Sequence, residues 1–141
     1  MTVVDALQAA LAVEHEAVYG YGLAASHLTA RLRTRALAEL TAAQARRDRL
    51  VALVHARGVT AVAPSPAYVP RTPVTDAGSA AALCLALNDA AAGAAWDLAS
   101  ASMADSQERA LAVSWIGAAA VGAAQWAGGP DKTAALPGQP A

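Results

Sequence analysis

The sequence predicts an all-α protein folded as one four-helix bundle, and three observations lead to that prediction. Roughly three residues in ten are alanine and only 4% are aromatic, a composition that favours helix. Apolar residues recur at spacings of three and four along four separate segments. A chain of 141 residues is long enough for one packed domain and too short for two ordinary ones.

The first two helices are expected at about residues 3–28 and 30–57, joined by a turn so short that they must be antiparallel neighbours. Thr29 has the side chain that an N-cap needs, so it suits the start of the second helix. Gly58 follows a basic residue at the other end, a pairing typical of a helix C-terminus.

Residues 58–74 form the connection to the third helix. Proline lacks an amide hydrogen and breaks helices, and this segment contains four prolines: Pro64, Pro66, Pro70 and Pro73. The sequence therefore predicts a long, extended, Pro-rich crossover between the second and third helices.

The second pair of helices follows the crossover. Thr75 or Asp76 is expected to cap a third helix through about residue 102, and a fourth is expected at 107–127, closed by glycines. The bundle then occupies residues 1–128, and residues 129–141 are expected to form a flexible C-terminal tail.

The segment 110–130 contains no charged residue and is long enough to cross a bilayer. Most of its apolar residues are alanine and glycine, which insert into membranes poorly. A fourth helix buried on nearly every side of a small bundle has the same composition, and this is the interpretation we favour over a membrane span.

Charge and cysteine content argue against several classes of protein. The formal net charge of −1 offers no electrostatic footprint for nucleic acid, and the arginines between residues 31 and 49 are interpreted as a solvated helix face. The single cysteine, Cys84, excludes an internal disulfide and a cysteine-based zinc site. The N-terminal residues MTVVDALQ carry no secretory pattern, so a cytoplasmic location is expected.

A carboxylate interrupts the apolar stripe of the first helix: in the series Leu7, Leu11, Glu14, Val18, Tyr21, only Glu14 is charged. On the second helix the corresponding series is apolar except for Arg47. Both residues lie about 25 Å from the turn at 1.5 Å per residue, so they should meet. We expect a buried polar cluster of Glu14, Arg47, Asp89, Tyr21 and Glu39, because a guanidinium satisfies a buried carboxylate. The alternative is a partly hydrated Glu14 at the rim of the bundle.

The order of two helices, a long crossover and two more helices is similar to that of ferritin-like proteins. More narrowly, four segments resemble a ferritin-like domain family of unknown function from high-GC bacteria: EHEAVYGYG (14–22), ARRDRL (45–50), SPAYVPRTPVTDA (65–77) and ALNDAAAGAAWDL (86–98). The similarity covers about residues 5–128. It implies an up-down-down-up four-helix bundle and supplies no activity.

A ferritin-like dinuclear metal site takes a glutamate from each of two helices and a Glu-x-x-His motif from each of the other two. No Glu-x-x-His occurs in this sequence, and residues 110–127 contain no Asp, Glu or His. We therefore expect neither metal nor cofactor, with Arg47 where a catalytic relative holds metal. The alternative is a reduced iron or manganese site formed by Glu14, Glu39 and Asp89.

Three functional hypotheses remain open. The leading one is a non-catalytic, metal-free interaction or scaffold protein, a homodimer through small-residue helix faces, with no catalytic residues. The second is a carboxylate metal-binding protein or oxidoreductase with the reduced site. The third is a small-ligand binder with a cavity at glycines inside the helices, which are Gly20, Gly22, Gly93, Gly117 and Gly122.

Overall fold

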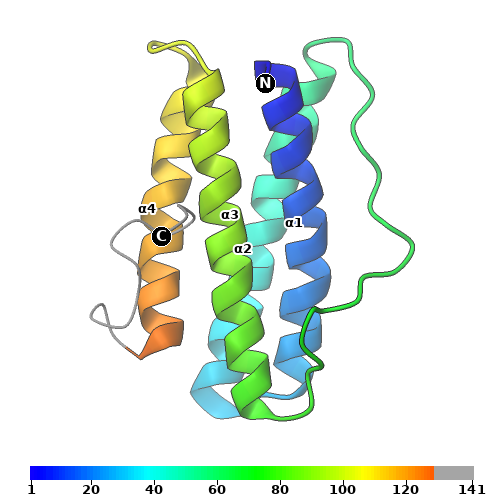
Figure 1. The fold of residues 1–141 in the computed structure, drawn as a ribbon, viewed down its shortest axis with the longest axis vertical. Helices are drawn as coiled ribbons and strands as arrows, with labels where there is room; N and C mark the ends of the chain where they lie inside the picture. The colour runs from blue at the N-terminus through cyan, green and yellow to red at the C-terminus, as the bar shows by residue number, and fades with distance from the viewer. Residues whose placement is uncertain (129–141) are drawn as a thin grey trace.

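The computed structural model describes residues 1–128, which form four helices without strands (Figure 1). The helices are α1 (Val3–Ser26), α2 (Ala30–His55), α3 (Ala77–Ala101) and α4 (Gln107–Ala127). The prediction of an all-α, four-helix protein is confirmed for this part of the chain. The predicted flexible tail, 129–141, lies outside the described residues.

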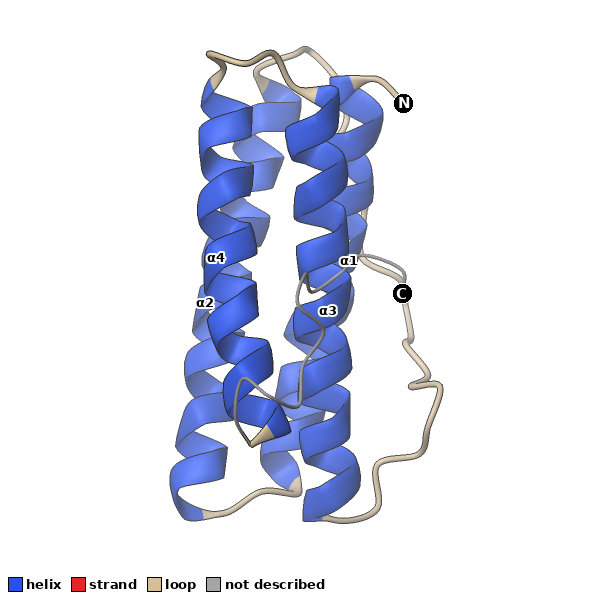
Figure 2. Ribbon diagram, turned by 60° about the vertical axis from the view of Figure 1, so that its left-hand side comes forward, coloured by secondary structure: helices blue, strands red, loops and turns tan. Residues whose placement is uncertain are grey.

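The helices run along one long axis (Figures 1 and 2). α1 and α2 are antiparallel, and residues 56–76 then run back along the length of the bundle before α3 begins beside the α1–α2 turn (Figure 1). α3 is consequently parallel to α2, and α4 returns antiparallel to α3. α3 packs closely against α4 and α1, and α1 against α2, whereas the backbones of α2 and α4 stay apart among the described residues.

Local signals set the helix ends. The Thr2 hydroxyl accepts a hydrogen bond from the Asp5 amide, and the Asp5 carboxylate accepts one from the Thr2 amide, which satisfies donors that the first turn leaves unpaired. Asp76 and Ser79 form the same reciprocal pair at the start of α3. Gly128 ends α4 with φ 85°, a left-handed conformation in which glycine has no Cβ to clash.

The crossover is fixed to α1 by hydrogen bonds. The Gln8 side chain donates to the Thr60 carbonyl at 2.7 Å and accepts from the Val62 amide at 2.8 Å. Further along, the rings of Tyr19 and Tyr68 lie 5.6 Å apart. These contacts hold an extended segment that forms no helix of its own.

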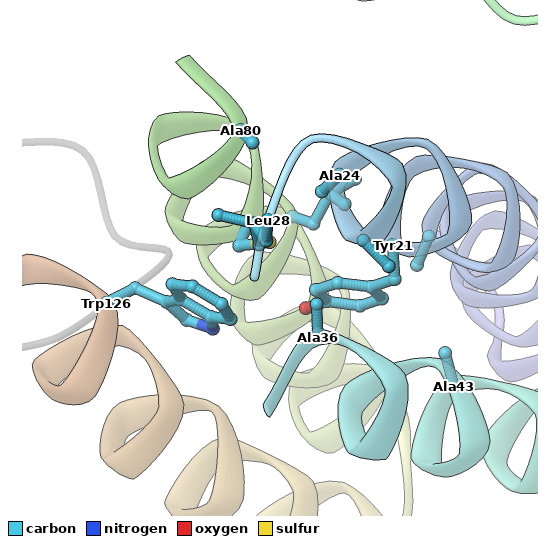
Figure 3. Packing of buried hydrophobic residues seen from close by; sticks show 11 residues of the cluster. Tyr21, Ala24, Leu28, Ala36, Ala43, Ala80 and Trp126 are labelled. Atoms are coloured by element: carbon cyan, nitrogen blue, oxygen red, sulfur yellow. The ribbon is translucent and has the colours of Figure 1, made fainter. Parts of the chain in front are cut away.

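Two groups of buried side chains form the core, one toward each end of the bundle. The group nearest the α1–α2 turn includes Tyr21 from α1, Leu28 from the turn itself and Trp126 from α4 (Figure 3). The other includes Leu11 and Leu50. Alanine supplies many of the remaining core positions, so the helices approach each other closely where large side chains are absent.

The expectation that the fourth helix is buried on nearly every side is wrong. Only 28% of the apolar window of α4 is buried, and Val113 and Val121 are 57% and 59% exposed. By length and composition alone, α4 could cross a membrane. The core helix of a soluble protein meets the same two criteria. The physical reason for its exposure is that α4 packs chiefly on α3, while its backbone stays apart from that of α2.

Candidate functional site

A buried ion pair joins the middle of α1 to the middle of α2. Arg46 donates through Nε to Glu14 Oε1 at 2.7 Å and through Nη2 to Oε2 at 3.1 Å, so both carboxylate oxygens are bound. The side chains are 5% exposed for Glu14 and 15% for Arg46. Burial raises the pKa of the Glu14 carboxyl, and the hydrogen bonds from Arg46 oppose that shift.

The partner of Glu14 is Arg46, and the prediction of Arg47 is wrong. Arg47 instead pairs with Asp48 at 2.8 Å on the helix surface, where the two side chains are 30% and 67% exposed. Successive residues on a helix point about 100° apart. Arg46 lies seven residues after Glu39, and both line one cavity, whereas Arg47 points away from it.

Asp89 also does not belong to this cluster, and its neighbour Asn88 takes the interior position. Asn88 is 3% exposed, whereas Asp89 is exposed and lines a separate groove with Glu16 and Arg71, below the crossover. The physical reason is again the rotation of about 100° between adjacent helical residues. The three carboxylates of the alternative metal site are therefore not brought together.

Tyr21 lies in the core beside the ion pair and bonds to Asn88. It is 1% exposed and its hydroxyl accepts a hydrogen bond from Asn88 Nδ2 at 2.9 Å. The same nitrogen donates to the Cys84 carbonyl at 3.1 Å. Burial, reinforced by the charge of Glu39, raises the Tyr21 pKa, so this hydroxyl remains neutral.

Glu39 is partly buried and borders the same space from α2. A Cβ built on Gly122 would lie 3.0 Å from Glu39 Oε1 and would overlap Asn88 Oδ1. Glu39 raises the pKa of Glu14 through its charge, so the two carboxylates are electrostatically coupled. Of the five predicted cluster residues, the structure thus groups Glu14, Tyr21 and Glu39, and adds Arg46 and Asn88.

Of this group, Glu14, Glu39, Arg46 and Asn88 line a cavity of about 250 Å³ between α2 and α4, with walls from all four helices. Its other polar residues are Arg35 and Gln125, and most of its remaining wall is alanine with Leu50 and Trp115. Arg35 donates to the Gln125 carbonyl at 3.2 Å, and its guanidinium lies 5.4 Å from the Trp126 ring centre. It is therefore held at one end of the cavity.

Within residues 1–128, no three His, Cys, Asp or Glu side chains gather closely enough to share a metal ion. His15 on α1 and His27 at its C-cap bond to backbone instead: His15 Nε2 lies 3.0 Å from the Val62 carbonyl, and His27 Nδ1 lies 3.3 Å from that of Leu23. The central cluster presents charged groups and hydrogen-bonding groups to the cavity.

Comparison with known proteins gives a family and a structural relative. Residues 6–141 match the family described as a domain of unknown function, DUF4439. The fold is similar to the crystal structure of a conserved hypothetical protein, rv2844, from Mycobacterium tuberculosis, with 30% identity and a TM-score of 0.80 over 86% of this chain and 92% of that one. No curated protein matches the sequence. Because the match spans nearly the whole chain, the protein belongs to the DUF4439 family.

Proposed function

We propose that this protein is a non-catalytic, metal-free interaction protein built on a ferritin-like bundle, and that it assembles as a homodimer through α4. The helix directions, with α2 parallel to α3 after a long Pro-rich crossover, support the ferritin-like assignment. The observation that carries the proposal is the uncharged, largely exposed outer surface of α4.

The ion pair supports the metal-free part of the proposal. Arg46 already donates to both oxygens of Glu14, so a metal ion at that carboxylate would have to displace a guanidinium and lie beside its positive charge. The iron or manganese alternative also requires Asp89, which lines the groove below the crossover. An arginine in this position neutralises Glu14 without supplying redox or Lewis-acid chemistry.

The outer surface of α4 has the composition of a helix that is covered by another apolar surface. No charged residue occurs from 110 to 127. Val113, Gly117 and Val121 are four residues apart and share one face, on which both valines are more than half exposed. Nothing lies within 4 Å of a Cβ built on Gly117, so the middle of that face is open. Contiguous exposed apolar surface of this kind is typical of an interaction site.

The arrangement of this face favours a second copy of the chain as the occupant. The two valines stand symmetrically about Gly117, so a two-fold axis through the glycine would set each valine against the other valine of the second copy. Glycine at the crossing point allows two helices to approach closely. The absence of charge on residues 110–127 leaves a charged partner nothing to complement.

Sedimentation equilibrium of the wild type and two matched variants tests this proposal. Val121→Glu introduces a charge into the α4 face, and Val69→Glu introduces the same charge on the crossover, where the side chain is 87% exposed. We expect a dimer for the wild type and Val69→Glu and a monomer for Val121→Glu. A monomeric wild type, a dimeric Val121→Glu variant, or partition of the wild type into lipid vesicles would overturn the proposal.

A further inference from the structure

The cavity between α2 and α4 is larger than packing defects usually are. Its volume is about 250 Å³, whereas one water needs only about 10–15 Å³. Its walls combine many alanines with a few polar side chains from all four helices. A mostly apolar pocket with a few convergent polar groups is the usual form of a small-molecule site.

Two oxygen atoms converge on one point of this cavity, above the backbone of Gly122. A Cβ there would overlap Asn88 Oδ1 and would lie 3.0 Å from Glu39 Oε1, so the Asn88 oxygen takes the place of a side chain at 122 and the Glu39 oxygen lies beside it. Both residues line the cavity. Because Gly122 lacks a side chain, the Asn88 and Glu39 oxygens can both lie this close to the backbone of α4.

The orientation of the Asn88 amide follows from its partners. Its Nδ2 lies 3.1 Å from the Cys84 carbonyl, which can only accept a hydrogen bond, so the nitrogen must be on that side. The oxygen therefore faces Gly122. The residue is 3% exposed, and Oδ1 accepts no hydrogen bond from residues 1–128. Since Asn88 lines the cavity, this oxygen can accept a hydrogen bond from a water or a ligand there.

Glu39 provides the charge at this point. Within the described residues it forms no ion pair or hydrogen bond, and Arg46, one of the two cations on the wall, is already bound through Nε and Nη2 to Glu14. The other wall cation, Arg35, is held by the Gln125 carbonyl at the cavity end. Glu14 and Arg46 neutralise each other, and Arg35 forms no ion pair with Glu39 among the described residues, so Glu39 is the carboxylate of the wall that can bind a positively charged group.

We propose that this cavity binds a small organic amine, whose ammonium group donates to Glu39 Oε1 and Asn88 Oδ1 above Gly122 and whose apolar part contacts Trp115 and the surrounding alanines. The two oxygens match two of the three N–H donors of an ammonium. A single carboxylate and a mostly apolar wall suit an amine with a hydrocarbon body better than a hydrated inorganic ion. This site is independent of the assembly through α4.

Calorimetric titration with 2-phenylethylamine tests the proposal, with 2-phenylethanol as the neutral analogue and phenylacetate as the anionic one. We expect the amine to bind and to raise the melting temperature, and both analogues to bind at least about tenfold more weakly, because a charged hydrogen bond contributes about 1.5–3 kcal/mol. Equal binding of the alcohol, stronger binding of the anion, or no binding of the amine would overturn the proposal.

Variants locate the binding within the cavity. Glu39→Gln keeps the shape and removes the charge, so amine affinity should fall about ten- to hundredfold while circular dichroism stays unchanged. Gly122→Ala would displace Asn88 Oδ1 and should abolish binding, whereas Gly22→Ala, where a Cβ meets nothing within 4 Å, should leave amine affinity unchanged. Unchanged affinity in Glu39→Gln would refute the site even if the alanine variant at 122 failed to fold.

Discussion

Loss of Arg46 should destabilise the bundle severely. Arg46→Met leaves the Glu14 carboxylate, 5% exposed, without its hydrogen bonds of 2.7 and 3.1 Å. Removing one partner of a buried pair costs about 3–5 kcal/mol because the remaining charge is uncompensated. For a domain of this size, that loss should lower the melting temperature by roughly 10–25 °C.

A double-mutant cycle separates this effect from simple loss of packing. Replacing both residues, as Glu14→Leu with Arg46→Met, removes both charges together, so the double variant should be more stable than Arg46→Met alone. Arg47→Met is the matched control: its surface pair with Asp48 should change the unfolding free energy by no more than about 0.5 kcal/mol. Urea unfolding followed by circular dichroism measures the wild type, the single variants Glu14→Leu and Arg46→Met, the double variant and the Arg47→Met control. The reasoning would be refuted if Arg46→Met and Arg47→Met lost the same unfolding free energy. It would also be refuted if the loss in the double variant equalled the sum of the losses in its two single variants.

Three further predictions concern packing, pH and thiol reactivity. Gly20→Ala places a Cβ 2.6 Å from Leu87 Cδ1 and should lower the unfolding free energy by about 1–3 kcal/mol. Gly22→Ala meets nothing within 4 Å and should raise it by up to about 1 kcal/mol. Urea midpoints of the two variants that move in the same direction would contradict this prediction. The hydrogen bond from Arg57 lowers the pKa of Glu108 below its ordinary value of 4.5, so its stabilisation is present above about pH 4.5 and is lost as the pH falls through the lowered pKa. The loss of unfolding free energy below pH 4.5 should therefore be shallower in Glu108→Gln, and identical pH profiles would rule the contribution out. Burial raises the pKa of the Cys84 thiol to about 12, so a disulfide reagent should label it only as fast as the protein unfolds; rapid labelling of the native protein would be inconsistent with its burial.

The helices were predictable because their signals are local. Asp76 caps α3, and the glycine after residue 127 adopts the left-handed conformation that ends α4. The observed helix ends differ from the predicted ones by no more than two residues. The exposure of one face of α4 was not predictable, because alanine and glycine suit a fully buried helix and a helix with one exposed face equally well.

The site was predictable in part. Glu14 could be identified because it alone interrupts an apolar stripe, but choosing between Arg46 and Arg47 requires the rotation of α2 about its axis, which is set by tertiary packing. Asn88 and its neighbour Asp89 also point about 100° apart, so choosing which of them faces the interior requires the rotation of α3 about its axis. A signal for Asn88 was present: it stands four residues after Cys84, on the apolar stripe of α3.

Metal content tests most directly whether Arg46 occupies the position at Glu14 where a metal ion would bind. The purified protein, from cells grown with added iron, manganese and zinc, should contain far less than one ion per chain by elemental analysis. A content near one ion per chain would contradict the metal-free centre, provided that Glu14→Gln abolished it and Glu16→Gln, at an exposed position on the same helix, retained it.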